Sequence, residues 1–579
     1  MRFIYAVIFF AVSLILLVSG LLIRHAFSAP DTFTQKISVS GDAPVTLIDA
    51  DELSRVSGSE TITVAGATQS DPQIPAPVTI AWGRKSDVVA WVGNAPYQVL
   101  TVNPETREVV ARTVSGTEGD IPSPSGSDLW FEEWTGEETV SADLALSDEN
   151  TVLIAGSGDV PAPRDISIVW TIEVDRTIPT TLLYLGAFSA LGGLIAFAIA
   201  MWHERVQRRI RRQGRMPKAP RGPRWKPPRK PIRFGGGRKP RRRRLAEFTA
   251  IVVAVPLALA GCAPPQEAQP TPIPTEVTEA PPVAISQMQL ERVLASITAT
   301  LAEADTASSV AIAETRLTGA ALRFRTAGYR VARVDASLVT LFDIPNVSVS
   351  LLLPQQTDDW PRSVFAVVED TENEETPSIA LVLTQETPRD NYLVSYTFAL
   401  EPGVVIPEVP SAEFGSAVLS PDNELLSATA EQIAEQYGDV LLLGEESAFS
   451  SVFEPDTLQE QIGVEAKAER SEALKGQAVF SWVESMAADT PIVFASSDAG
   501  GIVALTVTEA ETVKPASSGA AITTQGAVKI LSGRPTSFRG ITANYDYQLL
   551  FYVPSIGSAE KIRLLGYSYA LVSAGEARR

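Results

Sequence analysis

Three uncharged apolar segments divide the chain. Residues 3–23 and 177–202 contain no Asp, Glu, Lys or Arg. A helix rises about 1.5 Å per residue, so each segment could cross a bilayer core roughly 30 Å thick. Residues 248–261 are also uncharged, but this run is shorter and Pro256 interrupts it. We therefore expect two transmembrane helices, the first an uncleaved signal anchor, and one segment typical of the apolar core of a signal sequence.

Between the first two apolar segments, residues 26–176 show a strand pattern. Short runs of β-branched and aromatic residues, such as "PVTIAW", "VVAWVG", "YQVLTV" and "ISIVWTIEV", are separated by Gly, Pro, Ser and Asp. This spacing is roughly that of a β-sandwich. We expect an all-β, sandwich-like domain here.

The remainder of the chain shows the same order of elements twice. Residues 286–304 and 306–316 have helical character and precede strand-like runs that include "ALRFRTAGYRV" and "SVFAVVED". Residues 427–437 and 456–474 are again helical and precede runs that include "AITTQGAVKIL" and "ANYDYQLLFYVP". Helices followed by a meander predict an α+β region. The order resembles cystatin-like or nuclear-transport-factor-2-like folds in tandem.

Charge is distributed unevenly. The net charge is −20, yet residues 205–244 contain 19 Lys or Arg and no acid. Positive loops next to membrane helices stay in the cytoplasm. We therefore expect a basic, disordered cytoplasmic loop that attracts anionic lipid headgroups, with residues 26–176 and the C-terminal region outside. Docking of an acidic cytoplasmic protein is an alternative role for this loop, and nucleic acid is not an expected partner.

The composition excludes several kinds of chemistry. The two histidines, His25 and His203, flank apolar segments, and Cys262 is the one cysteine. This argues against Ser-His-Asp catalysis and against zinc or iron sites with His or Cys ligands, and it rules out an intramolecular disulfide. We expect no cofactor and no metal.

The third apolar segment ends in Leu259, Ala260 and Gly261, directly before Cys262. These four residues resemble the lipobox of bacterial lipoproteins. The resemblance implies transfer of diacylglyceryl to the Cys262 sulfur and cleavage before Cys262 by lipoprotein signal peptidase. Residues 263–282 contain seven prolines, which favour an extended tether like those of lipoproteins. The alternative is a short third membrane helix.

An internal lipobox is expected where two exported proteins have been joined, by gene fusion or by an error that joins two reading frames. The phrases "LTGAALRFRTAGY" and "FYVPSIGS" are similar to actinobacterial lipoproteins with a C-terminal domain of unknown function. That resemblance implies no biochemical role. The complete expected organisation is a signal anchor (1–25), an outer β domain (26–176), a second helix (177–202), a basic loop (203–245), a lipobox segment (246–262), a tether (263–284) and two α+β domains (285–425 and 426–579).

Candidate catalytic residues are few. Ser558 and Lys561 have the Ser-x-x-Lys spacing of penicillin-binding enzymes, but the companion tripeptides Ser-Asp-Asn and Lys-Thr-Gly are missing. Two adjacent acid pairs, Asp358 with Asp359 and Glu445 with Glu446, could in principle cleave glycosidic bonds. We interpret both acid pairs, as well as Ser558 and Lys561, more simply as residues of surface turns.

An aromatic cluster at Trp130, Phe131 and Trp134 could bind sugars or peptides, but such clusters more often pack a sandwich edge. The sequence thus predicts a membrane-anchored envelope protein that acts as a non-catalytic binding or assembly module. Its expected partners are membrane lipids and an envelope protein or polymer. The alternative is an envelope enzyme that acts on glycans through paired carboxylates. An open, uncharged cavity would favour the first function, and two acids in a cleft the second.

Overall fold

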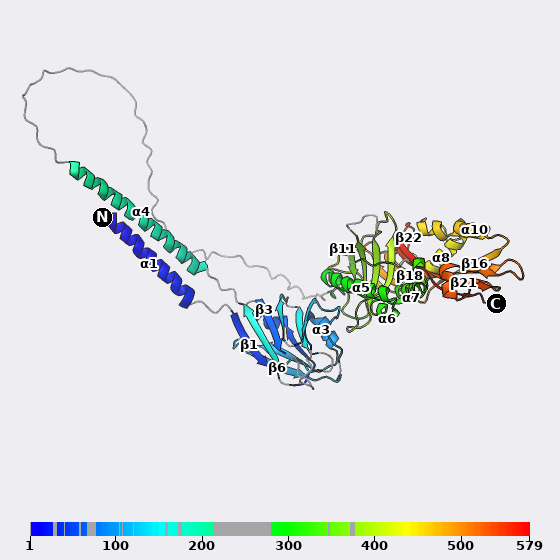
Figure 1. Cartoon of the computed structure of the whole chain (residues 1–579), viewed down its shortest axis with the longest axis horizontal. Coiled ribbons are helices and arrows are strands. Elements are labelled where there is room, and N and C mark those ends of the chain that lie inside the picture. The colour runs from blue at the N-terminus through cyan, green and yellow to red at the C-terminus, as the bar shows by residue number, and fades with distance from the viewer. Residues whose placement is uncertain are drawn as a thin grey trace, which may run out of the picture. The chain divides into compact units, whose positions relative to one another are not determined.

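The computed structural model (Figure 1) describes residues 2–26, 32–213 and 280–578 with short gaps. The gaps are residues 40, 57–58, 66–76, 104, 107, 120, 138, 148, 157–159, 172–176, 340, 346–347 and 371–376. Two compact units are present. One contains Met1–Ala29 and Val174–Glu279, and the other contains Pro30–Glu173 and Ala280–Arg579.

The first unit is a helical pair. Helices α1 (Arg2–Ala26) and α4 (Thr177–Gln213) pack along each other. A Cβ atom on Gly186 would lie 2.8 Å from Leu17 Cγ, so glycine permits this close approach. Phe3–Arg24 and Thr177–Val206 are long and apolar enough to cross a membrane, in agreement with the expected segments.

Helix α4 continues beyond the apolar segment to Gln213. The first part of the predicted disordered loop is therefore helical, and that part of the prediction is wrong. The physical reason lies in the local sequence, because residues 203–213 contain no Pro or Gly and consist largely of Arg and Gln, which favour helix.

The N-terminal β domain (residues 32–171) contains two sheets. The four-stranded sheet is antiparallel, whereas in the six-stranded sheet β2 pairs in parallel with β5. The first sheet has the order β1 (Thr32–Ser38), β10 (Asp165–Thr171), β3 (Ser59–Ala65), β8 (Thr139–Leu144). The second has the order β6 (Val109–Val114), β5 (Tyr97–Val102), β2 (Val45–Asp49), β9 (Asn150–Ala155), β4 (Val78–Arg84), β7 (Glu132–Gly136).

The two sheets share one hydrophobic core, which includes Ile62 and Trp170 from the first sheet and Ile80 and Ile154 from the second. The opposite face of the six-stranded sheet is covered by α3 (Lys85–Val92), which buries Val88 and Trp91. The sequence predicted "VVAWVG" as a strand, and this prediction is wrong. Val88, Trp91 and Val92 recur at helical spacing, so that one side of a helix covers the sheet. A short helix α2 (Ala50–Leu53) follows β2.

The C-terminal region (residues 280–578) is α+β, as the sequence predicted, and its main sheet has ten strands. Nine of them follow the order β11 (Ser348–Pro354), β12 (Arg362–Glu369), β13 (Ile379–Gln385), β14 (Leu393–Leu400), β22 (Arg563–Glu576), β21 (Ile541–Val553), β18 (Gly501–Pro515), β17 (Ile492–Ala495), β15 (Val418–Leu419). The tenth, β16 (Ala478–Met486), pairs with the far end of β18. A small separate sheet pairs β19 (Ile522–Thr523) with β20 (Thr536–Ser537).

The helices of this region are α5 (Gln287–Ala307), α6 (Val310–Ala313), α7 (Gly319–Ala332), α8 (Ala430–Leu443), α9 (Thr457–Ile462), α10 (Val464–Ala473) and α11 (Gly526–Ser532), with short 3-10 turns η1 (Ala336–Leu338) and η2 (Gly444–Glu446). Helices α5 and α8 open the two halves with the same device. Ser286 with Gln289, and Thr429 with Gln432, form reciprocal capping boxes. Each helical set packs on its own meander through a separate core.

The two meanders join into a single sheet. Their last strands, β14 and β22, pair through Ala399 with Tyr567 and Leu400 with Gly566. The sheet curls, because inward side chains from both meanders form one further core in which Phe365 and Phe494 lie 6.1 Å apart between ring centroids. Residues 416–419 connect the two edges, since Gln356 N donates to Ser416 O and Ala495 N donates to Ala417 O. The boundary between separate domains at 425 and 426 stays a prediction.

Two predicted strands of this region are wrong. The run "ALRFRTAGYRV" lies in helix α7, and "AITTQGAVKIL" is divided between β19 and helix α11. In α7, apolar and arginine residues alternate in a way that imitates a strand. Yet Ala320, Ala327 and Val331 recur at helical spacing, and Ala and Arg both favour helix.

Candidate functional site

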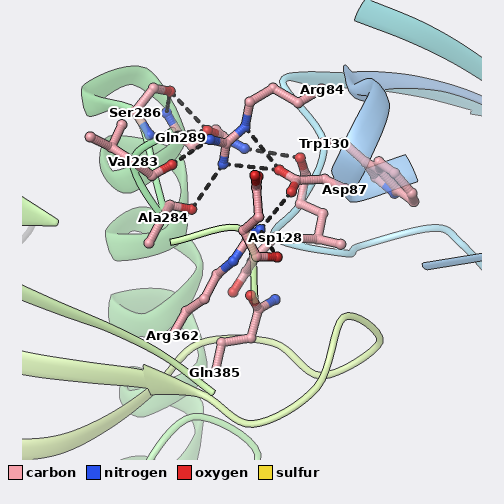
Figure 2. Close-up of polar contacts among 12 residues, drawn as sticks. Arg84, Asp87, Asp128, Trp130, Val283, Ala284, Ser286, Gln289, Arg362 and Gln385 are labelled. Atoms are coloured by element: carbon pink, nitrogen blue, oxygen red, sulfur yellow. Dashed lines mark hydrogen bonds and ion pairs between the residues drawn. The ribbon is translucent and has the colours of Figure 1, made fainter. Parts of the chain in front are cut away.

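The N-terminal β domain binds the C-terminal region through a surface that we call the docking interface (Figure 2). Its residues come from segments far apart in the sequence. The β domain contributes Arg84, Asp87, Trp91, Val92, Glu118 and residues 128–131, and the C-terminal region contributes Val283, Ala284, Gln289, Arg292, Arg316, Trp360, Arg362 and residues 389–392.

A fully buried ion pair lies within the docking interface. Arg362 Nη2 donates to Asp87 Oδ1 at 2.8 Å, and both side chains are 0% exposed. Arg84 binds the other Asp87 oxygen at 3.0 Å and also donates to the carbonyls of Val283 and Ala284. Asp87 lies in the first turn of α3, where the helix dipole favours an acid. One carboxylate thus connects a helix of the β domain to a strand of the C-terminal region.

The Arg362 guanidinium also lies over the Trp360 ring, 3.7 Å from its centroid. Trp360 packs against the second core of the β domain, which includes Trp91 and Trp130. Its indole Nε1 donates to Gln385 Oε1 at 2.9 Å, and this bond fixes the ring. The interface therefore combines apolar burial with the charged pair.

A second buried pair holds the loop that ends at Trp130. Arg316 Nη1 donates to Asp128 Oδ2 at 2.6 Å, with side-chain exposures of 8% and 5%. The same oxygen accepts from Tyr392 N at 2.8 Å, and Asp128 N donates to Asn391 Oδ1 at 3.0 Å. Asp128 is therefore bound by side chain and main chain together.

Side chains of helix α5 donate hydrogen bonds to main-chain carbonyls of residues 129–131. Gln289 Nε2 donates to Leu129 O at 2.9 Å, while its Oε1 caps α5 by accepting from Ser286 N. Arg292, one turn further along, donates to the carbonyls of Trp130 and Phe131. Burial lowers the pKa of Arg292 below its usual value, although nearby Asp128 opposes this shift.

Arg389 binds the C-terminal end of α3. Its Nε donates to Trp91 O at 2.8 Å and its Nη2 to Val92 O at 3.0 Å, so it satisfies carbonyls that the ended helix leaves without partners. Arg389 also forms a two-pronged pair with Glu118, and this hydrogen bond lowers the pKa of Glu118. Across the interface, acids of the β domain face arginines of the C-terminal region, which is electrostatic complementarity.

A cavity of about 700 Å³ lies beside the β14–β22 seam, between α7, η1 and α11. Its walls are mostly apolar and include Phe324, Leu341, Ala399 and Leu571. Leu338 and Tyr569 also line it and are 43% and 51% exposed, so the cavity opens to solvent beside apolar side chains. Its size falls within the range of small-molecule pockets, roughly 300–1,000 Å³.

Several polar side chains also line this cavity, and Ser568 among them donates to Thr397 O at 2.6 Å. Thr457 donates to Glu401 Oε1 at 2.6 Å, and the Tyr567 hydroxyl lies 3.4 Å from Thr457 Oγ1. Arg325 is already neutralised, because its guanidinium donates to Asp305 Oδ2 at 2.7 Å. The lining is therefore mostly apolar, with an acidic, hydroxyl-rich patch formed by Glu401, Thr457 and Tyr567.

A third cluster is buried between α10 and the sheet. Lys467 Nζ lies 2.6 Å from Glu509 Oε2 and 3.3 Å from Glu484 Oε1. Glu484 and Glu509 are direct partners on β16 and β18. Burial, reinforced by the Glu509 carboxylate, raises the pKa of Glu484 to about 8. All three side chains are at most 5% exposed, so this cluster belongs to the interior and not to a cleft.

The catalytic candidates predicted from the sequence are not brought together. Ser558 and Lys561 lie in an exposed turn, where Ser558 Oγ accepts from Glu560 N and Lys561 Nζ lies near Phe453 O. The two adjacent acid pairs, Asp358 with Asp359 and Glu445 with Glu446, are exposed on turns. Among the described residues, no group of His, Cys, Asp and Glu could hold a metal ion.

The predicted aromatic cluster packs inside the β domain. Trp130 is fully buried, donates from Nε1 to Pro124 O at 2.6 Å and contacts Trp91 edge-on. Phe131 packs on Trp82, and Trp134 packs against the core between the two sheets. Cys262 and its preceding Leu259, Ala260 and Gly261 lie outside the described residues, so lipidation stays a prediction.

Comparison with known protein families gives a match for the C-terminal region. Residues 281–576 match the family described as Domain of unknown function (DUF8094). The chain belongs to this family, whose match begins at the first residues of the docking interface and ends within β22. No curated protein and no solved structure matches the chain. This family match brings no described function, and no enzyme family is found.

Sequence reasoning missed the docking interface and the Lys467 cluster. Asp87 and Arg362 are separated by 275 positions, and each stands in the sequence as an ordinary charged residue. The signal that was present concerns α5, because "SQMQ" is a capping box whose glutamine also contacts the β domain.

Proposed function

We propose that this chain is a membrane-anchored protein of the bacterial cell envelope that acts outside the cytoplasmic membrane as a non-catalytic binding and assembly module. The cavity beside the β14–β22 seam is its binding site, and the ligand is apolar or amphipathic. The observation that carries the proposal is this cavity of about 700 Å³ with a mostly apolar lining and an acidic, hydroxyl-rich patch. Such a lining suits an acyl chain with a polar head.

Anchoring is supported by two helices long and apolar enough to cross a membrane. The basic residues 205–244 support a cytoplasmic location for the loop that follows α4, and hence an outer location for the β domain. The lipobox ending at Cys262 supports a second, lipid anchor for the C-terminal region. The chain is on this proposal a lipoprotein as well as a transmembrane protein.

The alternative, glycan cleavage by paired carboxylates, has less support. Glycosidases hold two carboxyl groups across an accessible cleft, roughly 5–9.5 Å apart. The exposed pairs at 358–359 and 445–446 lie on surface turns, and the buried pair Glu484 and Glu509 is closed off beneath α10 with Lys467. Neither arrangement provides an acid and a base on opposite sides of a substrate.

A photoreactive long-chain alcohol tests the proposal, because its uncharged head is compatible with the Glu401 carboxyl group in the cavity lining. The full-length chain, reconstituted in nanodiscs, is irradiated with a sixteen-carbon alcohol carrying a diazirine, and labelled peptides are mapped by mass spectrometry. Labels are expected on α7, β14 and β22 around the cavity. The Ala399→Phe variant should lose them, because Ala399 lines the cavity and lies on the helical face of the sheet.

The matched control is Ala468→Phe, which adds the same bulk at an exposed position on α10. Both variants are checked for unchanged circular dichroism. Labels that are spread over the surface, or that persist equally in Ala399→Phe, would show that the cavity is not the binding site.

A further inference from the structure

The docking interface holds the N-terminal β domain against the C-terminal region. We infer that residues 32–171 and 280–578 form one permanent complex on the same side of the membrane, and that they remain bound when the chain between them is cut before Cys262. The C-terminal region is thereby the binding partner of the β domain. This inference does not depend on the cavity or its ligand.

The charged contacts at the centre of the docking interface are buried. Asp87 and Arg362 are both 0% exposed, and Asp128 and Arg316 are nearly so. If the two parts separated, these charged side chains would face solvent on two surfaces that also expose Trp360 and part of the Trp91 core. Separation would therefore expose buried Trp and Arg side chains, the residue types that contribute most to binding at interfaces. Removing one partner of such a desolvated charge pair speeds dissociation.

The two sides of the docking interface carry complementary charges. Three acids of the β domain, Asp87, Glu118 and Asp128, each face an arginine of the C-terminal region. Arg389 and Arg292 in addition bind main-chain carbonyls at the end of α3 and in the loop after Asp128. Such matched pairs on both sides are not expected of two unrelated proteins joined by an error in a reading frame. The two parts are fitted to each other.

The docking interface constrains how the chain crosses the membrane. If α1 and α4 both cross the membrane, the β domain between them lies on one side and the residues just after α4 lie on the other. Docking returns the C-terminal region to the side of the β domain, so the chain must be delivered across the membrane once more between positions 214 and 279. The uncharged run at 248–261 is the apolar segment of that interval.

The docking interface would also hold the two products of a cleavage before Cys262 together. Cleavage before Cys262 would produce fragments 1–261 and 262–579. The first would be held by α1 and α4, and the second by lipid on Cys262. The docking interface would then join the two fragments as a heterodimer with an anchor on each subunit.

Controlled cutting of the full-length chain tests the inference. A site for a specific protease is placed between positions 266 and 279 in a Cys262→Ala chain with an affinity tag after Arg579, and the detergent-solubilised protein is cut and captured by the tag. We expect the resin to retain the N-terminal fragment in an amount equal to that of the tagged C-terminal fragment. We expect the N-terminal fragment to leave the resin only when denaturant is added. Release of the fragment in mild detergent buffer would overturn the inference.

Variants connect retention to the interface. The double change Asp87→Asn with Asp128→Asn should release the fragment at least roughly tenfold faster, since tenfold corresponds to only about 1.4 kcal/mol. The matched control is Asp42→Asn with Asp143→Asn, two exposed acids of the same domain. Equal release from both would contradict the assignment.

Charge reversal separates a broken interface from a misfolded domain. Glu118 and Arg389 are both partly exposed, at 34% and 24%, so reversal is tolerable there. Glu118→Arg should speed release, whereas Glu118→Gln, which can still accept a hydrogen bond from Arg389, should speed it less. Arg389 is left unchanged because it also donates to Trp91 O and Val92 O. Equal release from the two variants would show that the charge of Glu118 does not act across the interface.

Sidedness is tested in intact cells. Single cysteines are placed at Asp42 or at Ser517, both exposed, in a Cys262→Ala chain, and labelled with a membrane-impermeant maleimide. Both positions should react, whereas a cysteine at Gly236 should not. Reaction at one of the two outer positions and not the other would exclude a shared side and overturn the inference.

Discussion

Replacing Asp87 by asparagine probes the centre of the docking interface. The change keeps the shape of the side chain and removes the charge that faces Arg362 at 2.8 Å. Arg362 would then retain Asp358 O as an acceptor at 3.2 Å and the face of Trp360, but no opposite charge. Arg84 would keep its bonds to Val283 and Ala284.

The expected loss is large because the pair is fully buried. Removing one partner of a buried ion pair leaves an uncompensated charge and costs about 3–5 kcal/mol. The matched change Asp42→Asn removes an acid whose pair with Arg164 is exposed, at 81% and 47% for the two side chains. Exposed pairs contribute about 0–1 kcal/mol. The two variants should therefore differ by several kcal/mol although their chemistry is the same.

The assay is urea unfolding of the purified full-length chain, followed by pulse proteolysis to measure the fraction in which the interface has opened. A third variant, Asp87→Asn with Arg362→Met, removes both charges and should recover part of the loss, because apolar replacement of a buried pair is often neutral. A loss in Asp87→Asn no larger than that in Asp42→Asn would refute the reasoning. So would a double variant that is less stable than Asp87→Asn alone.

Three further predictions concern other parts of the chain. Burial raises the pKa of Glu484 from its ordinary value of about 4.5 to about 8, so between these pH values the folded state holds a proton that the unfolded state has lost. This stabilisation is complete below about pH 4.5 and disappears as the pH rises through about 8, so the free energy of unfolding should fall across that window in the native chain and fall less in Glu484→Gln; identical slopes would contradict this. Gly186→Val should separate α1 from α4, because its Cβ would meet the Leu17 backbone and side chain, whereas Gly192→Ala should leave the two helices in contact. The yield of photo-crosslinks between the helices measures their separation, and equal yields from the two variants would disprove the prediction. Cys262→Ala should abolish incorporation of radiolabelled palmitate and leave one uncleaved, membrane-bound chain on a gel, and label that survives the change would exclude lipidation at this cysteine.

Local pattern was sufficient for much of the fold. The apolar segments at 3–23 and 177–202 coincide with α1 and α4, and the helical spacing at 286–304 coincides with α5. These elements have a single apolar face or are apolar throughout, so the period identifies them directly. The repeated order of helices and strands after residue 285 also predicted an α+β region, which the structure has.

The failures have a common cause. Val88–Val92 and α7 are rich in residues that suit either structure, and their identity depends on the surface they cover. Helix α3 covers the six-stranded sheet, and α7 packs beside β14 and β22. Tertiary contacts of this kind are absent from a local pattern. The likeness of each half to cystatin-like or nuclear-transport-factor-2-like folds stays a prediction.

The candidate site was even less accessible from sequence. A buried aspartate such as Asp128 is identical in sequence to an exposed one, and its partner Arg316 lies 188 positions away. The sequence did indicate that the adjacent acid pairs and Ser558 with Lys561 are surface turns, and the structure places them on exposed turns. Only the arrangement in space shows which charges are partners.

The place of β22 in the sheet sets an order of events during synthesis. Strand β22 lies between β14 and β21, yet it follows both of them in the sequence. Because the chain is made from its amino terminus, the first meander and β21 exist before the strand that joins them. Until β22 is present, β14 and β21 each have an open edge that could pair with another chain. Synthesis that stalls before Arg563 would therefore expose two edges at the middle of what should be one sheet.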